Sequence, residues 1–341
     1  MKKIVAVFLV LLVVLPAFVF AGGQKAGGTS GGSGKIVIAL SNSFYGNSWR
    51  KQMVDAFIEA AERAKAEGKI SDYIVSNGDG TVNTQIAQMN SLILSGVSAI
   101  CINAASDTAL NSVIEQAIKQ GILVYAFDSI VTVPAAYKLD YDFVSWGRII
   151  AQYVADRFNG TANVLVVRGI MGSAPENAYY QGLTEVFAKY PGIRIVAEVD
   201  GEADTATTQS AVSNVLPSLP RVDAVLTHGG AYGAVQAFQA AGRPIPPIAG
   251  GNRAEFIKWW ADEYAKNGYE TISLGSEPSI GAQAFWAAYH ILKGKTVPNY
   301  MALPMVPISA KDLGAYKNME PGTVVAQKYD EAWVLKNIFK Q

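Results

Sequence analysis

Short apolar runs alternate along the chain with longer stretches in which apolar residues recur at helical spacing. Residues 36–40 are apolar throughout, as in a buried strand, and residues 49–67 repeat apolar side chains at helical intervals before Gly68. The same pattern predicts strands at 73–75, 97–102 and 122–127, and helices at 82–94 and 108–119. Strands and helices that alternate over short connections predict a parallel sheet covered by helices on both faces.

The pattern starts again after an expected loop at 132–138. It predicts strands at 163–167, 193–199, 224–226, 244–249, 272–274 and 323–326, and helices at 146–158, 177–189, 205–216, 233–241, 254–265, 281–292 and 331–339. The expected fold is therefore α/β, with two doubly wound parallel-sheet lobes joined by a multi-strand hinge. We expect the N-terminal lobe to comprise 35–132 plus 278–302, the C-terminal lobe 133–277 plus 303–341, and the hinge to lie near 130–134, 275–279 and 302–307.

The start of the chain predicts export. Lys2 and Lys3 precede an apolar run at 4–15, Pro16 breaks it, and small residues at 19 and 21 suit a cleavage site, so 1–21 is expected to be a signal peptide. A transmembrane anchor is the alternative for residues 4–21. Residues 22–34 are rich in Gly and Ser and predict a flexible tether. No cysteine stands at the expected cut site after the apolar run, so we expect a periplasmic or otherwise extracytoplasmic protein that is not a lipoprotein.

Composition narrows the possible partners. The 341 residues carry 28 basic and 28 acidic side chains, and this zero net charge gives no electrostatic reason to bind nucleic acid or an anionic membrane. A chain of this length favours two lobes over one core. The sole cysteine, Cys101, lies in an apolar run and predicts a buried thiol rather than a disulfide.

Polar residues follow most of the predicted strands directly, which is where ligands bind in open parallel sheets. We expect ligand contacts from the side chains at these strand ends: Phe44, Trp49, Arg50, Asp128, Ser129, Asn177, His228, Asn252, Arg253 and Glu277. Carboxylates, amides and guanidinium groups suit the hydroxyls of a sugar, and rings suit its C–H faces. Each residue also has a structural alternative: Asn177 could cap a helix, and Glu277, before Pro278, could belong to the hinge.

Enzymatic motifs are scarce. The chain holds no nucleophile elbow, zinc-protease motif or phosphate loop after a strand. Its only histidines, His228 and His290, fall on distant elements, which disfavours a catalytic metal. We therefore expect no enzymatic activity, no metal and no cofactor.

Three segments resemble a known family. The segment INAASDTALNSVIEQAIKQGILVYAFDS at 102–129 resembles type I periplasmic sugar-binding proteins, which are similar to ribose- and galactofuranose-binding proteins. YGNSWRKQM at 45–53 and GGAYGAVQAFQAAGRPIPPIAGGNRAEF at 229–256 resemble further segments of that family. Position by position, Asp128 matches the acidic residue that holds sugar hydroxyls. Asn177 stands where ribose binders have Arg, Asn252 where they have Asp, and Ser129 where an Arg often follows.

The resemblance implies a receptor that captures a monosaccharide between two closing lobes and delivers it to an ABC permease. We expect it to act as a monomer. The alternative is a sensory module that reports its ligand to a membrane receptor kinase or chemoreceptor. A repressor effector domain would need a helix-turn-helix before the first strand, and that place holds the expected signal and tether. An extracellular sugar-processing enzyme would need the motifs that are missing.

Overall fold

The computed structural model describes residues 35–316, 318–325 and 328–340, which belong to one compact unit, Lys35–Gln341. The expected signal peptide at 1–21 and tether at 22–34 lie outside the described residues. Among the described helices, none combines the length and the apolar character that crossing a bilayer requires.

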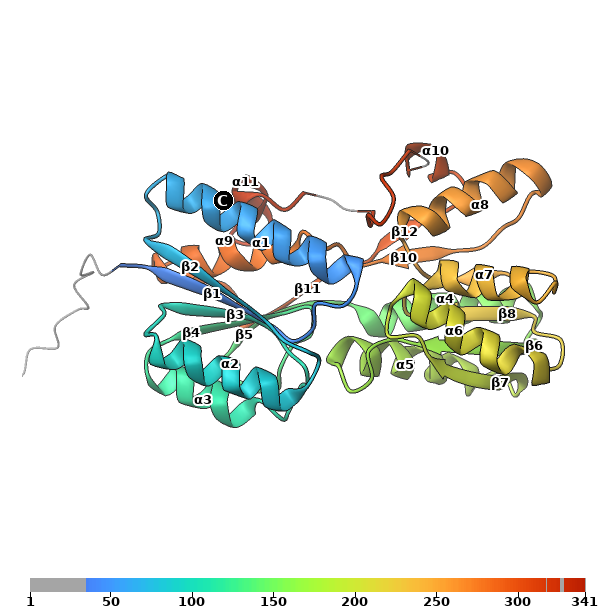
Figure 1. Ribbon diagram of the computed structural model, residues 1–341, viewed down its shortest axis with the longest axis horizontal. Helices are drawn as coiled ribbons and strands as arrows, with labels where there is room; N and C mark the ends of the chain where they lie inside the picture. The colour runs from blue at the N-terminus through green and yellow to red at the C-terminus, as the bar shows by residue number, and fades with distance from the viewer. Residues whose placement is uncertain (1–34, 317, 326–327, 341) are drawn as a thin grey trace, which may run out of the picture. The chain divides into compact units, whose positions relative to one another are not determined.

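The first lobe is built on a six-stranded parallel sheet (Figure 1). In spatial order its strands are β11 (Tyr300–Leu303), β5 (Tyr137–Tyr141), β4 (Leu123–Phe127), β3 (Ala99–Asn103), β1 (Val37–Asn42) and β2 (Asp72–Asn77). Helices α1 (Ser48–Ala66) and α9 (Ile280–Leu292) pack together on one face, and α2 (Val82–Leu94) and α3 (Asn111–Lys119) on the other.

Alternation along the central strands explains why both faces are covered. Ile38 and Leu40 share a core with α1 and α9, whereas Ala39 between them belongs to the core beneath α2 and α3. Because successive strand side chains point to opposite faces, an all-apolar strand has to be buried on both sides. Cys101 on β3 is buried, as expected, and its thiol donates to the carbonyl of Ala284 on α9 at 3.4 Å.

The second lobe is built on a four-stranded parallel sheet. Its strands in spatial order are β7 (Gly192–Asp200), β6 (Thr161–Arg168), β8 (Ala224–Thr227) and β9 (Ile248–Ala249). One face packs on α4 (Phe143–Arg157) and α5 (Ala174–Phe187); the other shares a core with α6 (Thr205–Val215), a short 3₁₀ turn (Leu216–Ser218), α7 (Ala231–Ala240) and α8 (Ala254–Asn267). The expected pair of doubly wound lobes is confirmed.

The remaining strands pair with each other outside the two large sheets, and the remaining helices come late in the chain. β10 (Ser273–Gly275) pairs antiparallel with β12 (Val306–Ile308). α10 (Leu313–Tyr316) packs near α8 in the second lobe, and α11 (Glu331–Asn337) packs on α9 in the first.

The lobes differ from their expected boundaries in two places. β5, expected partly as loop and assigned to the second lobe from residue 133, pairs with β4 and β11 in the first sheet. The C-terminal segment, assigned to the second lobe from residue 303, returns to the first lobe through α11.

Two expected strands are shorter than predicted. The strand at 244–249 is reduced to Ile248–Ala249, because three of the four residues before it are prolines, which lack the N–H that a ladder needs. The strand at 323–326 is reduced to a single bridge between Val324 and Arg253, and its last residue lies outside the described residues.

The chain passes between the lobes at Asp142, at 275–280 and at 303–306. A fourth passage follows Val324, which bridges to Arg253 of the second lobe, and the chain is back in the first lobe at α11. The expected hinge positions at 275–279 and 302–307 agree with two of these. The expected position at 130–134 is wrong, because Val131 and Val133 are buried in the core of the first lobe and the chain crosses only after β5.

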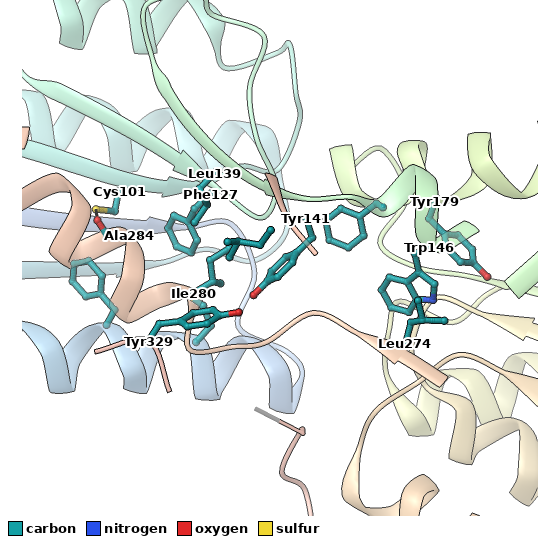
Figure 2. Close-up of a cluster of buried hydrophobic side chains, with 14 of the residues drawn as sticks. Cys101, Phe127, Leu139, Tyr141, Trp146, Tyr179, Leu274, Ile280, Ala284 and Tyr329 are labelled. Carbon is teal, nitrogen blue, oxygen red and sulfur yellow. Dashed lines mark hydrogen bonds between the residues drawn. The ribbon is translucent and has the colours of Figure 1, made fainter. Parts of the chain in front are cut away.

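A buried cluster ties three of the passages together. The Tyr141 hydroxyl, at the end of β5, accepts from the Glu277 N–H and donates to the Glu277 carbonyl, both at 3.1 Å. The Tyr329 hydroxyl interacts with Tyr141 and with the Glu277 carboxylate, and Figure 2 shows the two tyrosine hydroxyls pointing toward one another. These contacts therefore link the three segments at one buried point.

Candidate functional site

A pocket lies where the strand-end loops of the two lobes meet, and it leaves about 720 Å³ free of protein atoms, including space open to solvent. Ligands bind at this edge in open parallel sheets, beyond the carboxyl ends of the strands. The lining side chains come from both lobes and from the passage at 275–280: Asn47, Trp49, Arg50, Asp128, Phe143, Ile170, Ser173, Pro175, Ala203, Thr205, His228, Gly229, Gly230, Ala231, Tyr232, Gly251, Asn252, Arg253, Phe256 and Ser276.

Arg50 and Asp128 form the charged centre of the first lobe's contribution. Asn47 caps α1 by accepting from the Arg50 backbone N–H at 2.8 Å, which fixes the start of the helix beside the pocket. Arg50 Nη1 donates to Asn42 Oδ1 at 3.1 Å, and Nη2 lies 3.9 Å from Asp128 Oδ2. That separation exceeds a hydrogen bond, so both charged groups keep bonding capacity for a ligand.

Asp128 is held in an unusual position. Its backbone is left-handed, with φ 58°, its N–H donates to Leu139 on the neighbouring β5, and its Oδ2 accepts from Asn103 Nδ2 at 3.1 Å. A left-handed residue other than glycine costs on the order of 1 kcal/mol and recurs where geometry serves a function. The fold thus holds the Asp128 carboxylate at the pocket on a left-handed backbone.

Burial works against both charges of this pair. It lowers the pKa of Arg50, an effect that the Asp128 charge opposes. It raises the pKa of Asp128, opposed first by Arg50 and then by the hydrogen bond from Asn103. A ligand that hydrogen-bonds to both groups would replace the solvation that burial removes.

One backbone carbonyl connects the two lobes to the passage between them. Ser276 C=O accepts from Trp49 Nε1 of the first lobe at 3.1 Å and from Asn252 Nδ2 of the second at 3.3 Å. Both donors line the pocket. Contacts that a ligand makes with Trp49 or Asn252 are therefore one hydrogen bond away from the segment about which the lobes would rotate.

Arg253 is the second arginine of the pocket. It is buried, its Nη2 donates to the Ala203 carbonyl at 2.5 Å, and burial lowers its pKa against the charges of Glu255 and Asp204. Ala203 itself has a left-handed backbone, with φ 50°. The loop after β7 is thus bent to place a carbonyl on this guanidinium.

Glycines allow the loops after β8 and β9 to pass close to neighbouring residues of the second lobe. Gly230 has φ 70°, and a Cβ there would lie 2.2 Å from Thr208 Oγ1; Gly250 has φ 104°, and a Cβ there would lie 2.2 Å from the Thr227 carbonyl. Any other residue would clash at either position and would also strain the backbone.

His228 lies at the end of β8 among aromatic rings. Its ring stacks on Tyr179 with 4.7 Å between centroids and meets Trp146 and Phe143 edge-on at 5.0 and 5.6 Å. Its Nδ1 lies 2.7 Å from Glu176 Oε2. Apolar walls with a few fixed polar groups are typical of small-molecule sites.

Comparison with known proteins agrees with this architecture. The family model of the periplasmic binding protein domain matches residues 38–296. The chain belongs to the periplasmic binding protein family. Its members are substrate-binding proteins of ABC transporters rather than enzymes, so the expectation of a non-enzyme is confirmed.

Individual relatives of this periplasmic binding protein are consistent with the assignment. A solved ABC transporter solute-binding protein from Thermobispora bispora is 39% identical, with a TM-score of 0.84 over 89% of this chain and 95% of that one. The ribose import binding protein RbsB of Bacillus subtilis is 25% identical over 89% of this chain and 98% of its own. A xylitol-binding protein of Mycolicibacterium smegmatis is 29% identical over 52% of each chain.

Most of the residues expected at the site of this periplasmic binding protein do line the pocket: Trp49, Arg50, Asp128, His228, Asn252 and Arg253. The loops after β1, β4, β8 and β9 therefore meet at this pocket, as the strand-end argument predicts. Whether these residues hold a ligand stays a prediction.

Four expected residues are absent from the described lining. Phe44 bridges to Asp79 and packs over Gly46 of its own loop. Ser129 is fully buried and donates to the Ala104 carbonyl at 2.6 Å. Asn177 is exposed on α5. Glu277 is buried beside Tyr141 and Tyr329, so it belongs to the passage between the lobes, the alternative that the sequence already left open.

The position of Asn177 is explained by the cap of α5. Ser173 is the N-cap and Glu176 the third residue after it, so Glu176 turns inward and Asn177 outward. The spacing Ser173-x-x-Glu176 is the signature of a helix start and could have indicated this phase. No comparable signal marked the pocket residues Phe143, Tyr232 and Phe256. Each lies at the start of a helix that packs on the core, so its ring fits the pattern of a core residue.

Proposed function

We propose that this protein captures a monosaccharide or a related polyol in the pocket between its lobes and delivers it to an ABC importer. Binding is the whole activity, and no bond is made or broken. The observation that carries the proposal is the buried Arg50–Asp128 pair of the first lobe, which faces polar side chains and rings of the second lobe across one pocket.

The chemistry of the lining supports a polyhydroxylated ligand. Asp128 accepts, Arg50 and Arg253 donate, and Asn252 does both, which suits hydroxyls that are each donor and acceptor. The half-buried rings of Trp49 and Tyr232 offer surface for C–H groups. The names of the ribose import and xylitol-binding relatives add a ring pentose and an open-chain polyol as candidate ligands.

Lobe closure is the proposed mechanism. A ligand that touches both lobes favours the closed arrangement by the difference between its affinities for the open and closed states. We infer that the passages at Asp142, 275–280 and 303–306 absorb the rotation, since hinges are short segments between rigid bodies. The ABC permease then recognises the closed lobes.

The family acts outside the cytoplasmic membrane. We further propose that residues 1–21 are a cleaved signal peptide, that the mature protein carries no lipid anchor, and that it works as a monomer without nucleic acid. The lack of a cysteine at the expected cut site argues against a lipid anchor, and the zero net charge argues against binding of nucleic acid.

A thermal-shift panel tests the proposal. The panel contains D-ribose, D-allose, L-arabinose, D-galactose, xylitol and myo-inositol, with L-leucine and adenosine as controls. A ligand at about 100 times its Kd adds about 2.7 kcal/mol of stability, which is about 4 °C in Tm for a fold of roughly 300 residues. One or a few sugars or polyols should raise Tm by this amount. A shift with leucine or adenosine alone, or with nothing, would reject the proposed ligand class.

The sensory alternative uses the same fold and the same pocket. Among structural neighbours, a fructose-binding periplasmic domain of a hybrid two-component system has a TM-score of 0.71 at 20% identity, a likeness of fold alone. Deletion of the gene separates the two roles. Loss of radiolabelled ligand uptake supports transport, whereas normal uptake with loss of a transcriptional response supports sensing.

A further inference from the structure

His228 is held by a buried carboxylate on the side away from the pocket. Glu176 is fully buried, and its Oε2 lies 2.7 Å from His228 Nδ1 and accepts from the Gly169 N–H at 2.7 Å. Its other oxygen accepts from Arg168 Nε. Glu176 therefore has three donors around it and no exposed surface.

These donors keep Glu176 ionised. Burial alone would raise the pKa of its carboxyl, but the hydrogen bonds that it accepts from His228, Arg168 and the Gly169 N–H counteract burial, and the pKa is lowered. An ionised carboxylate can only accept hydrogen bonds. The proton shared between Glu176 and His228 therefore resides on Nδ1.

The ring cannot turn away from this arrangement. It stacks on Tyr179 and is bounded by the edges of Trp146 and Phe143, and the residue is only 8% exposed. Among the described residues none bonds to Nε2. Nε2 nevertheless does not belong to the buried polar atoms that lack a partner, so it is accessible to solvent. Because His228 lines the pocket, Nε2 opens into it.

We propose that His228 is a hydroxyl-selective acceptor: with its proton fixed on Nδ1 by Glu176, its Nε2 lone pair accepts from a ligand hydroxyl. This assignment rests on the proposed function and refines its ligand class. The ligand needs a hydroxyl at this position, because a carbonyl or ether oxygen there would set two acceptors against each other. The charged groups around the ring are Glu176 and Arg168 on the Nδ1 side and Asp128 across the pocket.

NMR of the ligand-free protein tests the proton position directly. His228 and His290 are the only histidines, so long-range ¹H–¹⁵N spectra contain two imidazoles. His290 is an internal control for the other tautomer, because its Nε2 lies 3.1 Å from Glu331 Oε1. At pH 8 we expect His228 with a pyrrole-type Nδ1 and a pyridine-type Nε2. Protonation of its Nε2, alone or together with Nδ1, would overturn the proposal.

A matched variant checks the role of Glu176. Glu176→Gln can donate to or accept from the imidazole, so His228 should populate both tautomers while His290 stays unchanged. An unchanged His228 spectrum in this variant would show that something other than Glu176 fixes the proton, which also overturns the assignment.

Binding tests the consequence. Deoxyfluoro derivatives of the panel compound that binds replace one hydroxyl at a time by a group that cannot donate. At one position the fluoro derivative should bind wild type about 10- to 100-fold more weakly, and His228→Ala should abolish that penalty while penalties at other positions persist. Equal penalties in both proteins at every position would refute the role of His228. If no panel compound binds, the proposed function fails, while the NMR result stands by itself.

Discussion

Replacement of Arg50 is the sharpest test of the pocket. In the structure one guanidinium donor goes to Asn42 Oδ1 at 3.1 Å, and Nη2 lies 3.9 Å from Asp128, so the remaining donors are available to a ligand. A hydrogen bond to a charged group contributes about 1.5–3 kcal/mol, which is roughly a 10- to 150-fold change in affinity. Arg50→Ala should therefore weaken binding at least tenfold.

The fold should survive this change. Arg50 is desolvated and its pKa is lowered by burial, so its charge is costly to the folded state even beside Asp128. Without it, the carboxyl of Asp128, whose pKa burial already raises, can take up a proton instead of remaining an isolated buried charge. We expect a loss of about 1–3 kcal/mol of stability, below the cost of leaving a fully unpaired buried charge.

Calorimetry with the sugar or polyol from the thermal-shift panel measures the effect. Arg148→Ala is the matched control, because that arginine forms an exposed ion pair with Glu185 on the second lobe and does not line the pocket. Arg50→Lys keeps the charge but loses the planar fork, and should recover only part of the affinity. A folded Arg50→Ala variant with a Kd within twofold of wild type would refute the assignment of Arg50 to the ligand site.

Three further changes probe the coupling between pocket, hinge and stability. Trp49→Phe keeps a ring but loses the hydrogen bond to Ser276, so affinity measured by calorimetry should fall about 2- to 12-fold; a larger loss would indicate that the ring itself is misplaced. Tyr141→Phe removes both hydrogen bonds to the Glu277 backbone, and should broaden the ligand-free distribution of distances between dyes on the two lobes in single-molecule FRET, whereas exposed Tyr300→Phe should not. Burial, followed by the Asp128 charge, raises the pKa of Asp140 to about 8. Between roughly pH 4 and that value the folded state holds a proton that the unfolded state has released, so stability falls as pH rises through this window. Asp140→Asn should therefore raise Tm by several degrees at pH 8 and leave it unchanged at pH 4. Parallel curves of Tm against pH for the two proteins would contradict the raised pKa.

The strand-end argument located much of the pocket because it depends only on where apolar runs stop. Asp128 directly follows the run 122–127, and His228 follows 224–226, so a correct strand places both at the ligand edge. The argument does not give the direction of a side chain within the loop. Ser129 comes after the same strand as Asp128, yet it points into the first lobe and bonds to Ala104.

Long-range pairing is what the sequence did not reveal. Tyr137, Leu139 and Tyr141 alternate with Lys138 and Asp140, a period-two pattern that fits a strand, but the two charged residues disfavoured a buried one. β5 pairs with β4 and, on its far side, with β11, which comes from a segment far along the chain. The same limit explains Glu277, which contacts Tyr141 and Tyr329 in the passage between the lobes, because both tyrosines are remote from it in sequence.

The return of the chain to its first lobe bears on how this protein would be turned into an optical biosensor. β1 begins at Val37 in the first sheet, and α11 packs on α9 against that same sheet. Fluorescent proteins fused directly before β1 and directly after α11 would both be attached to the first lobe, and would report little of the proposed movement between lobes. One reporter should instead be inserted in the second lobe, for which the exposed turn at Gly242, after α7, offers a place where a Cβ meets nothing within 4 Å.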